Sequence, residues 1–315
     1  MTGPRVVALG GGHGLYASLS ALRGTCDVLT AVVTVADDGG SSGRIREEMP
    51  VPPPGDLRMA LSALCEDTEW GRTWRDVLQW RFATGGPLDG HTVGNLLIAG
   101  LWDRTGGIVE GLDWVARLLR AEGRVLPVST EPITVSAEMG ADGATTRVVG
   151  QVAVATAPGR VRSLAIEPAD PAVPAATLEA LAEADAVVLG PGSWYTSVLT
   201  HFLVPRVASA LVEAGPRTIL TLNIADEDEE TAGTCRADDI AALRAAAPGF
   251  CPAVVLVDAS EDDAALRRRI EDWGARYVSA PMRAEGTLDR HDVRMLRDQY
   301  TSLVGWVREG GARVT

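Results

Sequence analysis

The sequence contains no lysine, so all 29 of its basic residues are arginines. A chain without lysine has neither a Schiff-base lysine nor a P-loop lysine, which excludes two common ways of holding a carbonyl or a phosphate group. A bound phosphate would therefore have to be held by backbone N–H groups, hydroxyls, arginines or a metal ion.

Cysteines and long apolar runs are also scarce. The four cysteines are Cys26, Cys65, Cys235 and Cys251. They form no C-x-x-C pair, so the spacing indicates neither a zinc site nor a redox motif. No run of about 18 apolar residues occurs, and no basic segment precedes an apolar stretch near the start. These features predict a cytoplasmic protein without a membrane span.

The charge balance narrows the class of partner. The 315 residues are 46% hydrophobic and carry a formal net charge of −13. Non-specific nucleic-acid binding needs a basic surface that displaces counterions from phosphates, so we expect no nucleic-acid partner. A small basic pocket for one anionic ligand stays compatible with this composition.

Alternating strand and helix patterns predict an α/β fold. Residues 6–9 form an apolar run that ends in glycines, leucines then recur at helical spacing, and residues 29–35 form a second apolar run. This order makes a βαβ unit. Further strands are predicted at 186–189, 218–222 and 253–257. The pattern favours a Rossmann-like, mostly parallel sheet with helices on both faces.

Two insertions interrupt this rhythm within one predicted domain spanning residues 1–315. The first is helical, over about 56–122, and Asp56 is expected to cap its first helix. The second covers about 132–166, where 133–135, 145–156 and 161–166 alternate apolar with polar residues around the turn at 141–143. That alternation predicts an antiparallel β insertion.

The first of three glycine-rich turns follows the first predicted strand. Glycines at 10–14 permit positive φ and let the backbone approach a phosphate at a helix N-terminus. Residues 12–17 also fit the G-x-G-x-x-A dinucleotide pattern, with Asp37 about 20 residues further on. On these residues alone, an NAD enzyme and a purely structural turn both stay open.

The second and third turns carry more polar groups. Residues 36–44 place Asp37 and Asp38 before serines, glycines and Arg44, so this turn suits Mg²⁺ or a hydroxylated ring better than NAD; a solvated loop is the alternative. Residues 190–197 follow another strand and open a predicted helix, which suits an anion. Ser193 could instead serve only as a helix N-cap there.

Five motifs in this order resemble the gluconeogenesis-factor (YvcK-like) family, within the wider fold of 2-phospho-L-lactate transferase. They are the first turn and residues 35–44, 53–58, 90–97 and 190–197. The resemblance covers nearly the whole chain. It implies a Rossmann-like core, a cytoplasmic location and binding of UDP-sugars such as UDP-N-acetylglucosamine. It also implies a role in gluconeogenic growth, cell shape and cell-wall synthesis, with no securely attached reaction.

The motifs and the resemblance together predict a ligand site, with Asp37 and Asp38 as candidate Mg²⁺ ligands and no other cofactor. The predicted ligand-binding residues are Gly11, Gly12, Gly14, Asp37, Asp38, Gly39, Ser41, Ser42, Arg44, Asp56, Arg58, His91, Asn95, Gly190, Gly192, Ser193, Tyr195, Thr196, Asn223 and Arg290. We expect a nucleotide-sugar ligand and a homo-oligomer.

Several positions depart from the family pattern. Within residues 223–231 the chain keeps Asn223 and the ending Glu230-Thr231. It lacks the Met-Thr-Gln-Pro-Gly run that the family usually has between them. Residues 290–292 resemble a family element that reaches the sugar or diphosphate, although Arg290 also fits a plain surface position. An alternative function is that of the 2-phospho-L-lactate transferases, which move phospholactate from a guanylyl carrier to a deazaflavin with Mg²⁺. They typically have Gly-Pro-Ser-Asn-Pro at the third turn, unlike residues 190–194 here.

Overall fold

The computed structural model describes residues 3–141, 144–224 and 236–311. Cys235, the turn residues 142–143 and the family-like ending at 230–231 lie outside the described residues. The strands are β1 Arg5–Gly10, β2 Val28–Val33, β3 Arg124–Pro127, β4 Thr134–Ala141, β5 Ala144–Val149, β6 Arg160–Glu167, β7 Ala186–Leu189, β8 Thr218–Thr221, β9 Val254–Asp258 and β10 Arg276–Ala280.

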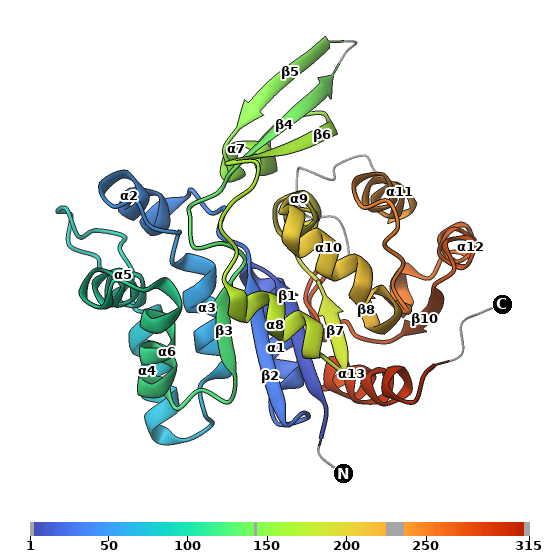
Figure 1. Cartoon of the computed structure of the whole chain (residues 1–315), viewed down its shortest axis with the longest axis horizontal. Helices are drawn as coiled ribbons and strands as arrows, with labels where there is room; N and C mark the ends of the chain where they lie inside the picture. Colours follow the sequence, from blue (N-terminus) through green and yellow to red (C-terminus); the bar gives the residue numbers. More distant parts are fainter. Residues whose placement is uncertain (1–2, 142–143, 225–235, 312–315) are drawn as a thin grey trace.

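The larger sheet has the order β10-β9-β8-β7-β1-β2-β3, and every neighbouring pair is parallel. The predicted α/β fold with a mostly parallel sheet is therefore confirmed. From β1 the chain builds β2 and β3 on one side, and β7 to β10 follow on the other (Figure 1). The strand order thus reverses between β1 and β7, where sheets of this kind bind their ligands.

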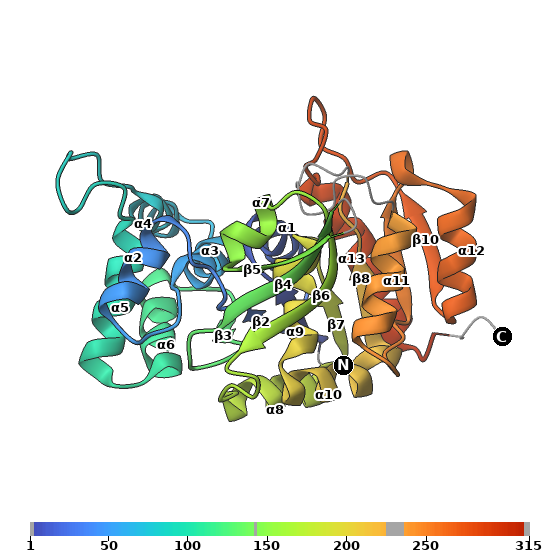
Figure 2. The ribbon, with the colours of Figure 1, turned by 90° about the horizontal axis from the view of Figure 1, so that it is seen from above.

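The helices are α1 Gly12–Leu22, α2 Gly40–Glu48, α3 Gly55–Leu64, α4 Glu69–Gln79, α5 Val93–Thr105, α6 Ile108–Leu119, α7 Gln151–Thr156, α8 Ala175–Glu183, α9 Thr200–Leu203, α10 Pro205–Ala214, α11 Arg236–Ala246, α12 Ala264–Trp273 and α13 Val293–Arg308. On one face of the sheet, α1 packs between α3 and α13, while α8 and α10 cover the other face (Figure 2). No single helix among the described residues is long and apolar enough to cross a membrane.

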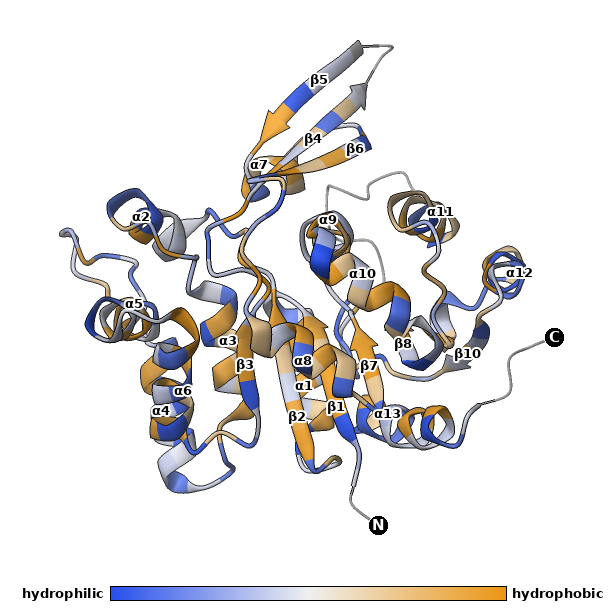
Figure 3. Cartoon of the chain, in the orientation of Figure 1, coloured by the Kyte–Doolittle hydropathy of each residue, from blue (hydrophilic) through white to orange (hydrophobic). Residues whose placement is uncertain are grey.

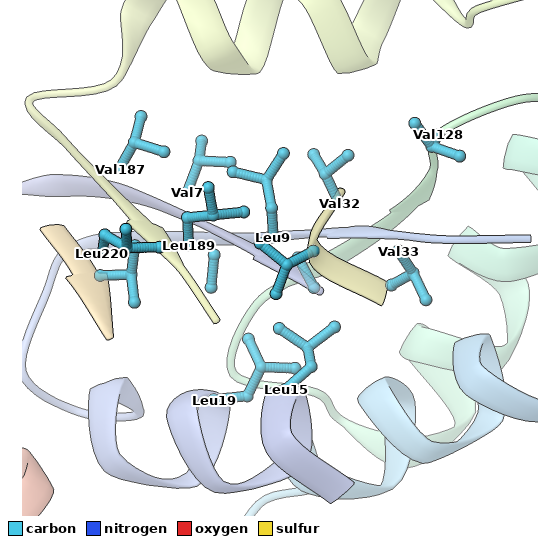
Figure 4. Close-up of a cluster of buried hydrophobic side chains, with 14 of the residues drawn as sticks. Val7, Leu9, Leu15, Leu19, Val32, Val33, Val128, Val187, Leu189 and Leu220 are labelled. Atoms are coloured by element: carbon cyan, nitrogen blue, oxygen red, sulfur yellow. The ribbon is translucent and has the colours of Figure 1, made fainter. Parts of the chain in front are cut away.

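The core explains why the central strands are apolar on both sides. Leu9 of β1 pairs with Val32 of β2 and with Leu189 of β7, and all three are fully buried. Leu15 and Leu19 of α1 lie against these strands (Figure 4). Hydropathy follows the same division, because the strands of the larger sheet are mainly apolar and the outer helices carry the polar residues (Figure 3). Burial on both faces is typical of parallel sheets.

The segment after Asp37 is more ordered than the sequence predicts. Residues 36–44 are expected to be a glycine-rich polar turn, yet α2 begins at Gly40 and runs to Glu48. Glycine and serine are weak helix formers. Tertiary hydrogen bonds compensate here, since the Ser41 hydroxyl lies 3.0 Å from His91 Nδ1 and Ser42 Oγ accepts the Gly55 N–H at 3.1 Å.

The predicted antiparallel insertion is present as a second sheet in the order β5-β4-β6. One part of the prediction is wrong: residues 151–156, expected to continue a strand, form the short helix α7. Gly150 ends the strand at φ +108°, and both oxygens of the Asp38 carboxylate then accept N–H groups from Gln151 and Val152. The alternation of valine and alanine in α7 mimics a strand pattern.

Candidate functional site at the carboxyl edge of the sheet

The first and third glycine turns touch each other at the carboxyl ends of β1 and β7. A Cβ atom added at Gly14 would lie 2.2 Å from the Pro191 carbonyl oxygen, so only glycine permits this approach. The second turn joins them, because Asp37 lines the same cavity as Gly12 and Gly192. The three glycine-rich turns therefore lie side by side at one edge of the sheet.

A cleft in two halves opens above these turns. Its acidic half, about 390 Å³, is lined by the first turn together with Thr34, Asp37, Asp56, Gln151 and Thr196. The other half, named the arginine half after Arg290, is about 570 Å³ and is lined by Tyr16, Asn223, Ile224, Asp289, Arg290, His291 and others. The waist, formed by His13, Gly14, Gly192 and Ser193, lines both halves. One ligand could therefore reach from one half into the other.

Asp56 belongs to the acidic half and does not cap a helix as predicted. The residue before α3 is Pro54, and no side chain among the described residues caps that helix. The Asp56 carboxylate instead accepts the N–H of Gly12 and lies near Asp37. Burial, and secondly the charge of Asp37, raise the pKa of Asp56 to about 7. The acidic half therefore holds two carboxylates, of which one is partly protonated at neutral pH in the absence of a ligand.

Asp37 and Asp38 serve different purposes although they are adjacent. Asp37 lines the cleft, and its Oδ1 accepts the Gly39 N–H at 3.0 Å. Both oxygens of Asp38 accept N–H groups at the start of α7, at 2.9 and 3.0 Å, so this carboxylate fastens the antiparallel insertion to the second turn. The pair of carboxylates that faces one space is Asp37 with Asp56.

Two cleft residues carry no motif in the sequence. Thr34 follows β2 and is 3% exposed, and its hydroxyl has no hydrogen-bond partner within the described part of the chain. Gln151, the first residue of α7, donates from Nε2 to Thr196 Oγ1 at 3.3 Å. A lone threonine after a strand and a lone glutamine after a glycine give no sequence signal. Only the folded chain brings them to the cleft.

The third turn is held by its own neighbours. Asn223 Oδ1 accepts the Gly192 N–H at 2.7 Å, and its Nδ2 donates to the Gly192 carbonyl at 2.9 Å. Ser193 Oγ accepts the Thr196 N–H at 3.4 Å, as an N-cap does. The predicted helix is a five-residue π turn followed by the four-residue α9, so its dipole is weak. The 11-residue α1 presents the longer helix N-terminus to the waist.

A buried polar network supports the acidic half from behind. Asn95 Oδ1 accepts from Arg58 Nε at 2.9 Å, and Asn95 Nδ2 donates to Ser42 Oγ at 3.5 Å. Burial and the neighbouring Arg81 lower the pKa of Arg58 to about 10. These side chains join α2, α3 and α5 to one another. Ser42, Arg58 and Asn95 thus form hydrogen bonds with one another inside the protein.

The predicted site residues therefore fall into two groups. Those that line the cleft are Gly11, Gly12, Gly14, Asp37, Asp56, Gly192, Ser193, Thr196, Asn223 and Arg290. Those placed behind or beside it are Asp38, Gly39, Ser41, Ser42, Arg44, Arg58, His91, Asn95, Gly190 and Tyr195. Arg44, for example, donates to the Asp89 carbonyl at 2.7 Å.

The donor set can be tested against a metal ion. Among the described residues, no group of three or more His, Cys, Asp or Glu side chains could hold one. Magnesium commonly binds one or two carboxylates and completes its shell with water and phosphate oxygens. Asp37 and Asp56 line the same space and fit that pattern together, whereas Asp38, whose two oxygens each accept an N–H group of α7, is not among the residues that line it.

Comparisons with known proteins agree with this architecture. The family model described as 2-phospho-L-lactate transferase CofD matches residues 6–300. The gluconeogenesis factor of Bacillus subtilis is 34% identical over 301 residues, which cover 95% of this chain and 92% of that protein. The chain belongs to the CofD family. Within it, the chain is similar to the gluconeogenesis factors.

Two further similarities support this membership. A Mycobacterium tuberculosis protein is 49% identical over 258 residues, which cover 81% of this chain and 75% of that protein. A crystal structure of a UPF0052 family member from Bacillus halodurans superimposes with a TM-score of 0.85 at 33% identity. It covers 95% of this chain and 99% of that one. The fold is thus that of the UPF0052 family member.

Proposed function

We propose that the cleft binds a nucleoside-diphosphate sugar, such as UDP-N-acetylglucosamine, across its waist. The observation that carries this proposal is the division of one cleft into an acidic half and an arginine half that share Gly14 and Gly192. A ligand with a polar ring at one end, a diphosphate in the middle and a base at the other end matches that division.

Each half favours a different part of the ligand. In the acidic half, Asp37 and Asp56 can accept hydrogen bonds from sugar hydroxyls, and the unpartnered Thr34 hydroxyl adds a donor. A bare diphosphate beside these carboxylates would be repelled. In the arginine half, the half-buried Tyr16 offers apolar surface to a base, and the exposed Arg290 can reach a phosphate.

The diphosphate is proposed to lie at the waist. The N-terminus of α1 begins there at Gly12, and a helix N-terminus favours an anion. Glycine at 14 and 192 keeps side chains out of this narrow part. Because the chain has no lysine, backbone N–H groups, hydroxyls and Arg290 would supply the positive potential.

The biological role follows from the relatives as a proposal. We infer a ligand-dependent regulatory protein linked to gluconeogenic growth, since relatives carry the name gluconeogenesis factor. A link to cell shape and cell-wall synthesis is proposed from the family resemblance of the motifs alone. Cytoplasmic location and a homo-oligomeric state stay predictions. Cell fractionation tests the first, and sedimentation velocity the second.

Calorimetry with two ligands and two variants tests the placement. Asp37→Asn should weaken UDP-N-acetylglucosamine binding by at least tenfold and leave UDP binding within about twofold, because UDP lacks the sugar. Arg290→Gln should weaken both ligands, whereas Arg294→Gln, in the first turn of α13 and not among the residues that line the cleft, should change neither. Equal losses of both ligands in Asp37→Asn, in buffer without divalent cations, would reject the sugar's assignment to the acidic half.

The family description supports one second candidate, transfer of phospholactate from a guanylyl carrier to a deazaflavin. Asp37 and Asp56 would then hold Mg²⁺, which would neutralise charge on the diphosphate. Incubation of the protein with both substrates and Mg²⁺ tests this candidate. Product formed by wild type but not by Asp56→Asn would favour the transferase function. If wild type forms no product but binds a UDP-sugar measurably, the regulatory function is favoured.

A further inference from the structure

A chain of three buried hydroxyls lies directly beneath the third turn, and no step of ligand binding described above uses it. Tyr300 of α13 is fully buried, and its phenol oxygen is 2.9 Å from Ser18 Oγ and 3.0 Å from Thr221 Oγ1. Ser18 Oγ is in turn 2.9 Å from the carbonyl oxygen of Gly190. Ser18 and Thr221 are at most 1% exposed.

The direction of donation along this chain follows from its end. A carbonyl oxygen only accepts, so Ser18 must donate its single proton to Gly190. The proton between Ser18 and Tyr300 therefore comes from Tyr300, and the proton between Tyr300 and Thr221 comes from Thr221. Burial raises the pKa of Tyr300 to about 12, so the phenol keeps its proton at neutral pH.

Each partner of Tyr300 is continuous with a wall of the cleft. Ser18 lies on α1, whose first residues form the waist, and Gly190 precedes Gly192 by two residues. Thr221 ends β8 and precedes Asn223, which clamps Gly192 through two hydrogen bonds. Helix α13 itself follows the segment that carries Arg290. The hydroxyl chain thus joins α1, β8, α13 and the turn after β7 under the cleft.

We propose that Tyr300 is a positioning residue that holds the waist in its ligand-binding geometry through Ser18 and Thr221. The identity of the ligand in this inference rests on the proposed function. The way in which Tyr300 acts on the waist rests on the hydroxyl chain alone. Loss of the phenol oxygen leaves Ser18 without a donor and Thr221 without an acceptor. The Gly190 carbonyl keeps its bond to Ser18, but Ser18 is no longer linked to Thr221, so the turn at Gly190 loses its connection to the strand that leads to Asn223.

Tyr300→Phe tests the proposal against a matched control. Thr218 is fully buried at the opposite end of β8, where its hydroxyl donates to the Ala214 carbonyl at 2.9 Å. Thr218→Val therefore removes a buried hydroxyl from the same strand, away from the cleft. Calorimetry with UDP-N-acetylglucosamine should show at least fivefold weaker binding for Tyr300→Phe and unchanged binding for Thr218→Val. Equal affinities for Tyr300→Phe and wild type would overturn the proposal.

A second measurement needs no ligand. Amide hydrogen exchange in residues 190–196 should be at least fivefold faster in Tyr300→Phe and in Ser18→Ala than in wild type, and unchanged in Thr218→Val. The double variant should exchange no faster than Ser18→Ala alone, because both changes break one chain. If wild type binds no nucleotide sugar, the proposed function fails while exchange still decides the role of Tyr300. Unchanged exchange in Tyr300→Phe would refute it.

Discussion

Replacement of Asp56 by asparagine should stabilise the ligand-free protein, although Asp56 faces the cleft. The side chain is partly buried between the first turn and Asp37, and its pKa rises from 3.8 to about 7. A raised carboxyl pKa means that the folded state prefers the protonated form. Stability from this group is therefore complete below about pH 4, is lost as the pH rises towards 7, and stays lost above.

The size of the effect follows from the shift. A change of roughly 3 pKa units corresponds to about 4 kcal/mol, at about 1.36 kcal/mol per unit, as an upper bound. Because the cleft leaves Asp56 some access to water, we expect Asp56→Asn to raise the free energy of unfolding at pH 8 by about 2 kcal/mol. At pH 4 the variant and wild type should be equal, since the wild-type carboxyl is then protonated.

Urea unfolding at several pH values measures this directly. The difference in unfolding free energy between Asp56→Asn and wild type should grow between pH 4 and pH 7 and then level off. A ligand or cation that binds the charged Asp56 carboxylate should stabilise wild type more than the variant. Added ligand should therefore reduce the difference in unfolding free energy between the two proteins at pH 8. Two results would refute the raised pKa of Asp56: a variant that is less stable than wild type at pH 8, or a difference in unfolding free energy that does not change with pH.

Three further changes have expected outcomes. Gly14→Ala places a Cβ 2.2 Å from the Pro191 carbonyl oxygen, so it should abolish the thermal shift given by UDP-N-acetylglucosamine while circular dichroism still shows a folded protein. Asp38→Ala removes the acceptor of two α7 N–H groups; it should cost about 1 kcal/mol and speed proteolysis within residues 134–167, and an unchanged cleavage rate would contradict this. Asn95→Leu leaves Arg58 Nε without its acceptor and should lower the unfolding free energy by about 2 kcal/mol in urea, whereas a neutral result would show that the buried network is dispensable.

The sheet could be predicted from the sequence because its strands obey local rules. Residues 6–9 and 186–189 are apolar on both sides and end in glycine, which is the pattern of a buried parallel strand before a turn. The edge strands β3 and β10 were not predicted. Arg124 and Arg276 open them, and the pattern of β10 is only half-buried. Their positions depend on the strands beside them.

The site could be predicted only in part, because tertiary contacts decide which polar groups face the ligand. Adjacent residues such as Asp37 and Asp38 look equivalent in the sequence. In the structure, however, the Asp38 carboxylate accepts two N–H groups from the start of α7. Asp56 looks like a helix cap, yet Gly12 supplies the N–H that it accepts. The partners lie from about 40 to more than 100 residues away along the chain. No local pattern encodes such distances.

Calorimetry of the wild-type protein with UDP-N-acetylglucosamine and with NAD tests the central claim most directly. If the two-part cleft is a nucleotide-sugar site, UDP-N-acetylglucosamine should bind saturably at one site per chain, and NAD should give no saturable heat at the same concentrations. Saturable binding of NAD with no signal from the UDP-sugar would contradict the assignment of the cleft.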